Sequence, residues 1–179
     1  MKNILISTTL LLSVATTSVS AFDIRASYKT TELSVVGLAE DEVTLGSFDS
    51  YGLGIGSYST VDEDEKSGFG AGYYTNVYLP TQSEYGQSVD VGFALGYTFL
   101  DMLTPKALFG GEAQVLNESI LTVAYTFGAA VEVELFEHLI ADVTYKYNTF
   151  YARLDQSQSG GFEHVYTGSD IIFGLGYRF

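Results

Sequence analysis

Nine charged residues of this chain stand where they could form an enclosed ion-pair network. Each lies in a segment in which large apolar side chains alternate with small or polar ones, and each falls on the small or polar side. Charges enclosed in a protein have to be paired or strongly hydrated. A solute path lined by these charges is one interpretation. We favour the other, a structural network of salt bridges and water, formed by Asp23, Arg25, Lys106, Glu112, Glu132, Glu134, Asp142, Lys146 and Arg178.

The two histidines are the remaining candidates for catalysis. His138 falls in an expected turn, where an exposed position is the simpler explanation. His164 is close in sequence to Ser169 and Asp170, and a His–Ser–Asp set could support nucleophilic catalysis. The spacing does not match the His-x-Ser motif of lipid A deacylases. We therefore expect no catalytic residues.

Two acidic runs, at 40–42 and 62–65, could attract divalent cations, because carboxylate oxygens suit calcium and magnesium. Neither run has the Asp-x-Asp-x-Asp-Gly loop pattern. We interpret both as solvated connections and expect no metal site and no cofactor. The chain has no Cys, which excludes disulfides and thiolate chemistry. Its net charge of −14 argues against nucleic acid as a partner, because phosphates require a basic surface.

The elements that would position these charges are short segments in which large apolar side chains alternate with small or polar ones. In the last segment, large side chains from Ile171 to Phe179 alternate with others that are mostly small or charged, such as Gly174 and Arg178. A period of two predicts a β-strand. The pattern recurs in eight segments that are long enough to cross a bilayer at a tilt, at 22–29, 47–59, 69–79, 89–99, 106–115, 121–135, 141–153 and 171–179.

The apolar side of these segments is too bulky to be the inside of a barrel. The chain has 14 Tyr and 12 Phe, whereas an eight-stranded barrel has an interior that side chains only just fill. The large side chains must then face outward, towards lipid, which argues against a soluble lipocalin-like barrel. Because lipid cannot satisfy open strand edges, the sheet must close. Two aromatic girdles are expected, one from Tyr28, Tyr51, Tyr147 and Tyr151 and the other from Phe22, Phe99 and Phe179.

The amino terminus is interpreted as a signal peptide. Lys2 precedes a short apolar run at 4–14, and Val19, Ser20 and Ala21 offer small residues for cleavage. We therefore expect a cleaved segment at 1–21 and one barrel domain at 22–179. An even number of strands places both ends of the domain on the periplasmic side. Tight turns are then expected at 101–105 and 137–139, and long outer connections at 31–46 and 154–169.

The final strand, with Tyr177 and Phe179 at its end, resembles the assembly signal of bacterial outer-membrane proteins. Together with the signal peptide and the eight segments, it makes 22–179 similar to the small OmpA/OmpX-like barrel family. The resemblance implies an all-β, eight-stranded antiparallel up-and-down transmembrane β-barrel in the outer membrane of a Gram-negative cell. It also implies contact with outer-membrane lipid, and with the barrel assembly machinery and periplasmic chaperones during biogenesis.

A structural or surface-interaction role, with an external partner reached through the outer loops, is the function we expect of such a barrel. The first alternative is a small-solute channel of the porin kind. A lipid-modifying enzyme and a soluble periplasmic binding protein are less favoured. A peptidoglycan-binding domain of the kind that follows OmpA-type barrels is not expected here.

Overall fold

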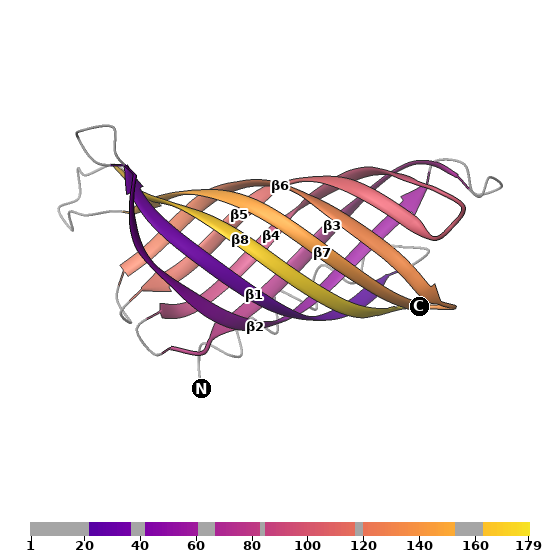
Figure 1. Ribbon diagram of the computed structural model, residues 1–179, viewed down its shortest axis with the longest axis horizontal. Helices are drawn as coiled ribbons and strands as arrows, with labels where there is room; N and C mark the ends of the chain where they lie inside the picture. Colours follow the sequence, from indigo (N-terminus) through magenta and orange to yellow (C-terminus); the bar gives the residue numbers. More distant parts are fainter. Residues whose placement is uncertain (1–21, 37–41, 61–66, 83–84, 117–119, 153–162) are drawn as a thin grey trace.

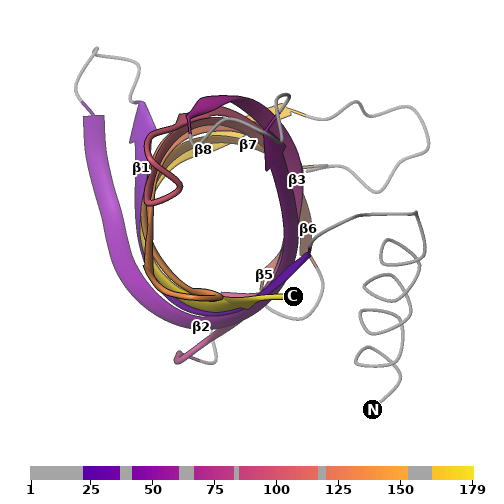
Figure 2. The same ribbon diagram turned by 90° about the vertical axis from the view of Figure 1, so that its right-hand side faces the viewer.

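The computed structural model describes residues 22–36, 42–60, 67–82, 85–116, 120–152 and 163–179. Each strand pairs antiparallel with the next along the chain, and the last pairs with the first, so that the sheet closes (Figures 1 and 2). This confirms the predicted all-β, eight-stranded antiparallel up-and-down barrel. The strands are β1 (Asp23–Val36), β2 (Glu42–Thr60), β3 (Gly68–Pro80), β4 (Tyr85–Thr98), β5 (Leu103–Leu116), β6 (Ile120–Phe136), β7 (Leu139–Ala152) and β8 (Glu163–Arg178).

The two ends of the barrel differ because Phe22, just before β1, and Phe179, just after β8, meet at one of them. The amide of Phe179 donates a hydrogen bond to the carbonyl of Phe22 at 2.9 Å, and their rings stack with centroids 4.8 Å apart. We call this the termini end, on the right in Figure 1, and the opposite one the far end. Among the described residues, no helix is long and apolar enough to cross a membrane.

The strands extend further than the hydropathy pattern indicates. β1 continues to Val36, β2 starts at Glu42 and β8 starts at Glu163. The long connections expected at 31–46 and 154–169 are therefore partly strand. In these stretches polar residues occur on both faces of the sheet. Thr31 is buried on the inner face, while Glu32 on the outer face is opposite Ser169, so the ladder persists where the hydropathy signal has ended. The expected signal peptide and the acidic run at 62–65 lie outside the described residues.

Two turns at the termini end, β4–β5 and β6–β7, are short. The β4–β5 turn is Leu100 to Met102 rather than 101–105, because β5 already begins at Leu103. Leu100 and Asp101 have φ angles of 51° and 57°, and His138 in the β6–β7 turn has 75°. These left-handed conformations match the tight twist of a short hairpin connection. The observed turn at 137–138 agrees with the expected position.

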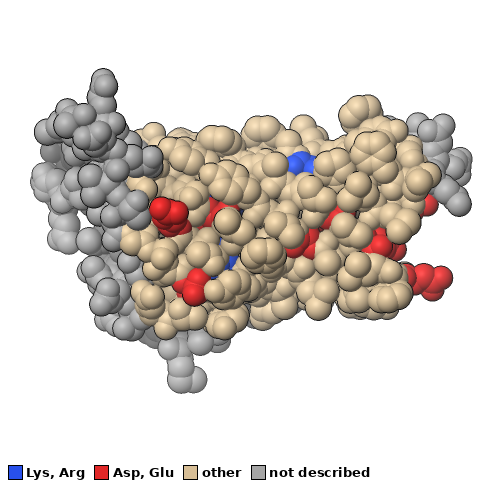
Figure 3. All heavy atoms as spheres, in the orientation of Figure 1, with Lys and Arg blue, Asp and Glu red and all other residues tan. Residues whose placement is uncertain are grey.

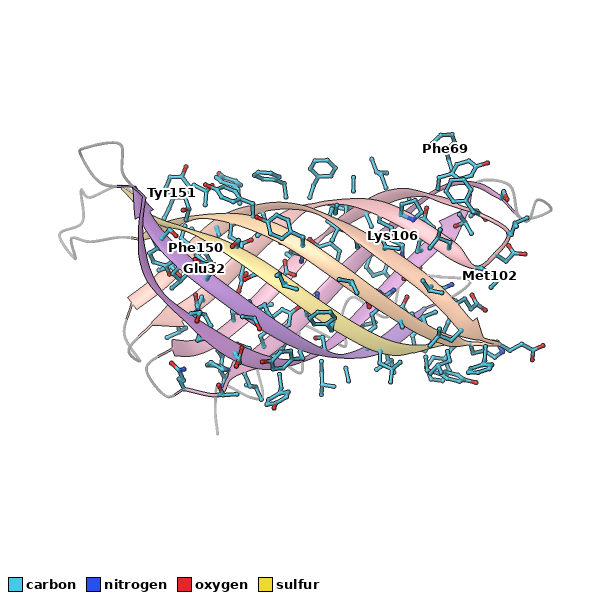
Figure 4. All side chains as sticks on the ribbon, in the orientation of Figure 1. Glu32, Phe69, Met102, Lys106, Phe150 and Tyr151 are labelled. Carbon is cyan, nitrogen blue, oxygen red and sulfur yellow. The ribbon has the colours of Figure 1, made fainter. Side chains whose placement is uncertain are left out.

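Large apolar side chains cover the outside of the barrel, as predicted. Phe69, Phe93 and Tyr125 are each at least 70% exposed. Figure 3 shows an outer wall on which acidic and basic atoms are sparse, and Figure 4 shows Phe69 pointing away from the ribbon. The inner face is small at many positions because it has to accommodate bulky neighbours. A Cβ added at Gly52 would lie 2.6 Å from the ring of Tyr78, which is directly opposite on β3.

Candidate functional site: the charged lumen

The lumen near the termini end holds a group of interlinked charges that we call the termini cluster. Arg25 lies at its centre and contacts three carboxylates from three strands. Its Nε is 2.7 Å from Asp23, its Nη2 2.6 Å from Glu132 and its Nη1 3.2 Å from Asp142. The full cluster consists of Asp23, Arg25, Lys106, Glu132, Glu134, Asp142 and Arg178.

Glu132 is the acceptor that joins the strands of this cluster. Besides Arg25, its carboxylate accepts from Lys106 Nζ and from Arg178 Nη2, each at 2.6 Å. Arg178 also reaches Glu134 at 3.4 Å. The side chains of Arg25, Arg178 and Glu134 are 20%, 24% and 32% exposed, so water reaches the edge of the cluster. A space of about 240 Å³ adjoins it at the termini end, lined in part by Thr60, Thr98, Glu134 and Arg178.

A second group, the middle cluster, lies deeper and consists of Lys29, Asp90, Glu112, Lys146 and Asp170. Lys29 Nζ is 2.8 Å from Glu112 and 3.9 Å from Asp170, and Lys146 donates directly to Asp90. All five side chains are at most 3% exposed.

Neutral side chains complete the coordination of the middle cluster. Asp170 accepts a hydrogen bond from Thr31 and another from Asn148, each at 2.7 Å. Asn76 lies 3.4 Å from Asp90. Each carboxylate of this buried group therefore has at least one donor, as burial requires. Among the described residues, one oxygen of Asp90 and the amide oxygen of Asn148 are buried without a hydrogen-bond partner.

Every lysine among the described residues also stacks on a tyrosine ring. Lys29 lies 4.2 Å from the ring centroid of Tyr78, and Lys146 lies 4.1 Å from that of Tyr74. In the termini cluster, Lys106 lies 4.3 Å from Tyr58. An ammonium over a ring face gains cation–π attraction while it keeps its carboxylate partner. The same three-part unit of lysine, carboxylate and tyrosine is thus repeated inside the barrel.

Between the two clusters lies a chamber of about 70 Å³. On the far-end side of the middle cluster, buried apolar residues form a plug. Arg25, Lys106 and Lys146 contribute to the chamber wall. Figure 4 shows Phe150 near the far end of the barrel and Lys106 nearer the termini end. The rings of Phe150 and Tyr166 are 4.6 Å apart. The buried residues that form the plug are Leu33, Phe48, Ala124, Phe150 and Tyr166.

The nine charges singled out from the sequence all lie on the lumen side, but the structure divides them. Glu112 and Lys146 belong to the middle cluster, and the other seven make up the termini cluster. Sequence reasoning missed Lys29, Asp90 and Asp170. For Lys29 and Asp90 the signal was present, since both stand on the inward register of segments that were recognised. Asp170 was missed because its segment was taken to begin at Ile171.

A hydrolytic site from His164, Ser169 and Asp170 does not agree with the structure. Asp170 is buried in the lumen, whereas Ser169, the preceding residue on β8, lines a groove on the outer wall. Adjacent residues on a strand point to opposite faces, so these two cannot act together. The side chain of His164 lies outside the described residues. His138 is exposed in its turn, with its ring 5.5 Å from that of Tyr177.

Within the described ranges, no group of three or more acidic or histidine side chains is arranged to hold a metal ion. The run at 62–65 lies outside those ranges, and so do 40 and 41 of the other acidic run, with the side chain of Glu42.

No protein-family model and no curated protein matches the chain. Solved structures with a similar arrangement include Ail, the attachment invasion locus protein of Yersinia pestis, at 13% identity and a TM-score of 0.49, over 90% of this chain and 100% of that one. Neisserial surface protein A is 13% identical with a TM-score of 0.45, over 89% and 99%. The outer membrane protein OprG from Pseudomonas aeruginosa is 13% identical with a TM-score of 0.46, over 90% and 96%.

Proposed function

We propose that this protein is an integral barrel of the Gram-negative outer membrane, with its termini end in the periplasm and its far end at the cell surface. The observation that carries the proposal is the reversal of polarity across the wall. Phenylalanine, tyrosine and leucine side chains are exposed all around the outside, while every described lysine and arginine lies in one of the two lumen clusters. A closed sheet with an apolar exterior suits lipid as its solvent.

The proposed role is structural or surface-interacting, without catalysis and without a cofactor. The filled lumen supports this interpretation. A solute moving along the axis would have to pass the termini cluster, the middle cluster and the apolar plug in turn. Parting the middle cluster would leave charges unpaired in a water-poor space, at a cost of about 3–5 kcal/mol for each broken buried pair. The nine predicted charges then serve to order and close the barrel.

The partners follow from the same geometry. Outer-membrane lipid would contact the apolar wall, and the external partner would be reached through the connections at the far end. Tyr177 and Phe179 are exposed at the end of β8, which suits recognition by the barrel assembly machinery and periplasmic chaperones. We propose that 1–21 is a signal peptide, removed before Phe22.

A small-solute channel is the second candidate. It is favoured by the chamber of about 70 Å³, whose wall includes Arg25, Lys106 and Lys146, and by the larger space that opens beside the termini cluster. Conduction would require the clusters to rearrange, because the chamber lies between them. The two candidates therefore differ in what they predict for current through a single reconstituted barrel.

Two measurements test the proposal in sequence. Cell envelopes are fractionated, and the protein is run on a denaturing gel with and without boiling; we expect it in the outer-membrane fraction, with a mobility shift on boiling. Recovery as a soluble periplasmic protein without a shift would contradict the membrane assignment. The purified barrel is then placed in a planar bilayer beside an open porin as the positive control. Silence favours the structural role, and discrete conductance steps favour the channel.

A further inference from the structure

Two spaces in the lumen share one wall. One is the chamber of about 70 Å³ between the clusters, and the other is the space of about 240 Å³ at the termini end, which we call the vestibule. Thr60, Thr98, Glu134 and Arg178 line part of the vestibule. Among the described residues, Tyr58 alone lines both spaces, so its side chain separates them.

The ring of Tyr58 lies across the lumen from β2 towards β4. The buried apolar cluster that contains it also includes Ala94, Leu108 and Ala130. A Cβ added at Gly70 of β3 would come within 2.7 Å of the Tyr58 Oη, and one added at Gly96 of β4 within 3.1 Å of the same atom. Gly70 and Gly96 are opposite each other in the β3–β4 ladder, so two absent side chains leave room for one ring.

The rest of the wall is made of ion pairs. Arg25 and Lys106 line the chamber, and Glu132, which each of them contacts at 2.6 Å, lines the vestibule. Tyr58 is held by a weaker contact, because Lys106 Nζ lies over its ring at 4.3 Å. When the ring moves away, Lys106 keeps its carboxylate. The wall therefore opens most readily at Tyr58, and the vestibule provides space for the displaced ring.

The charges on the two sides of Tyr58 differ in sign. Three acids and one cation line the vestibule, namely Asp101, Glu132, Glu134 and Arg178. Three cations and one acid line the chamber, namely Arg25, Lys106, Lys146 and Asp142. An anion is repelled on the first side and a cation on the second, whereas a neutral molecule meets neither barrier. Inside the chamber, the buried Oγ of Ser27 has no hydrogen-bond partner among the described residues and is available to such a molecule.

We propose that Tyr58 is a gate, and that its movement into the vestibule admits small neutral polar molecules from the termini end to the chamber. On the far-end side, the middle cluster and the apolar plug close the chamber. The gate therefore opens a one-sided pocket and not a pore. This role goes beyond the structural function proposed above and does not depend on what surrounds the outer wall.

The test measures the access of a small reagent to the chamber. Because the chain has no Cys, a single introduced thiol reports on its own position. Ser27→Cys places the thiol in the chamber, and Thr60→Cys places it in the vestibule. The full barrel in detergent is treated with hydroxyethyl methanethiosulfonate, a neutral thiol reagent, and its mass is followed with time. We expect Thr60→Cys to react rapidly, and Ser27→Cys to react completely but more slowly.

Variants at position 58 test the gate itself. Added to Ser27→Cys, Tyr58→Ala should raise the labelling rate about tenfold, the scale of the desolvated cation–π contact that opening must break. Tyr58→Phe keeps the ring face and should keep the original rate. Each variant must show the boiling shift before it is labelled, and Tyr58→Leu replaces Tyr58→Ala if the latter does not.

The matched control is Phe150→Ala, which removes a buried ring from the apolar plug on the far-end side. It should leave the labelling rate of Ser27→Cys unchanged, and an acceleration equal to that of Tyr58→Ala would overturn the gate. Two results with the native Tyr58 would also overturn it. Labelling of Ser27→Cys as fast as that of Thr60→Cys would mean that no barrier exists, and complete protection would mean that the wall is fixed.

The class of solute is tested with reagents of similar size and different charge. Aminoethyl and sulfonatoethyl methanethiosulfonate carry a positive and a negative charge. Relative to their rates at Thr60→Cys, both should react more slowly at Ser27→Cys than the neutral hydroxyethyl reagent does. A charged reagent that reaches the chamber more readily than the neutral one would overturn the assignment to neutral molecules.

Failure of the proposed function gives a different result from failure of the gate. A pocket closed on its far-end side predicts no current in the planar bilayer. A barrel that conducts, yet shows the expected labelling pattern, would overturn the structural role and keep the gate. A silent barrel whose labelling does not respond to Tyr58→Ala would overturn the gate alone.

Discussion

The two clusters inside the barrel use the same kinds of residue under different conditions. The termini cluster is built around arginines, which share several carboxylates and keep about a fifth to a quarter of their side chains exposed. The middle cluster is built around Lys29 and Lys146, each buried and each held mainly by one carboxylate. Loss of one member should therefore be tolerated where water and spare partners are at hand, and should be costly where neither is available.

The sharpest test of this contrast is Lys146→Met in the middle cluster. It keeps most of the bulk of the side chain but leaves Asp90 buried without its lysine, opposite Glu112 on β5. We expect the free energy of unfolding to fall by about 3–5 kcal/mol. The loss of the boiling shift is followed against urea concentration. As a control, Lys146→Met combined with Asp90→Asn should be more stable than the single variant, and a double variant that is less stable would contradict the buried-charge explanation.

Glu132→Gln breaks the hub of the termini cluster and should have a smaller effect. Arg25 keeps Asp23 and Asp142, and Arg178 keeps Glu134. The buried Lys106 loses its carboxylate but can still donate a hydrogen bond to the amide oxygen of the glutamine. We expect a loss of about 1.5–3 kcal/mol, the scale of a hydrogen bond to a charged group. The same urea titration measures it. A loss larger than that of Lys146→Met would reverse the proposed ranking of the clusters.

Gly52→Ala probes the packing under Lys29 without changing any charge. The new Cβ would come within 2.6 Å of the Tyr78 ring, so the ring and the ammonium stacked on it must shift. Overpacking of this kind should cost about 1–2 kcal/mol. Gly68→Ala is the control, because the nearest atom to its added Cβ is 3.9 Å away. Equal stability of the two variants would argue against a tightly packed middle cluster.

Arg178→Gln is expected to have the smallest effect. Its side chain is partly exposed, and Glu132 retains Arg25 and Lys106. A surface-like ion pair contributes less than about 1 kcal/mol and weakens with salt. The difference from wild type should shrink further between low and high salt in the urea titration. A salt-independent loss as large as that of Lys146→Met would show that the termini cluster is as dry as the middle one.

The sequence predicted the fold and the inward register well, because both depend on a period of two that any strand must follow. The same period, continued by one step from Arg25 and Ser27, points to Lys29. The period of two does not show which carboxylate pairs with which cation. Glu132 meets cations from β1, β5 and β8, which are far apart in the sequence and meet only because the sheet closes with one particular register.

The pairing of β1 with β8 has a consequence for how the chain folds. These strands lie at opposite ends of the domain, so their ladder closes a loop of nearly the whole chain and gives the fold a high contact order. Until β8 arrives, β1 presents an unpaired edge that could recruit a foreign strand. Arg178 of β8 reaches Asp23 of β1, and Arg25 of β1 reaches Glu132 of β6 and Asp142 of β7. These ion pairs across the seam form only on closure, so they should contribute little to the rate of folding and most of their effect to slowing the reopening of the ring.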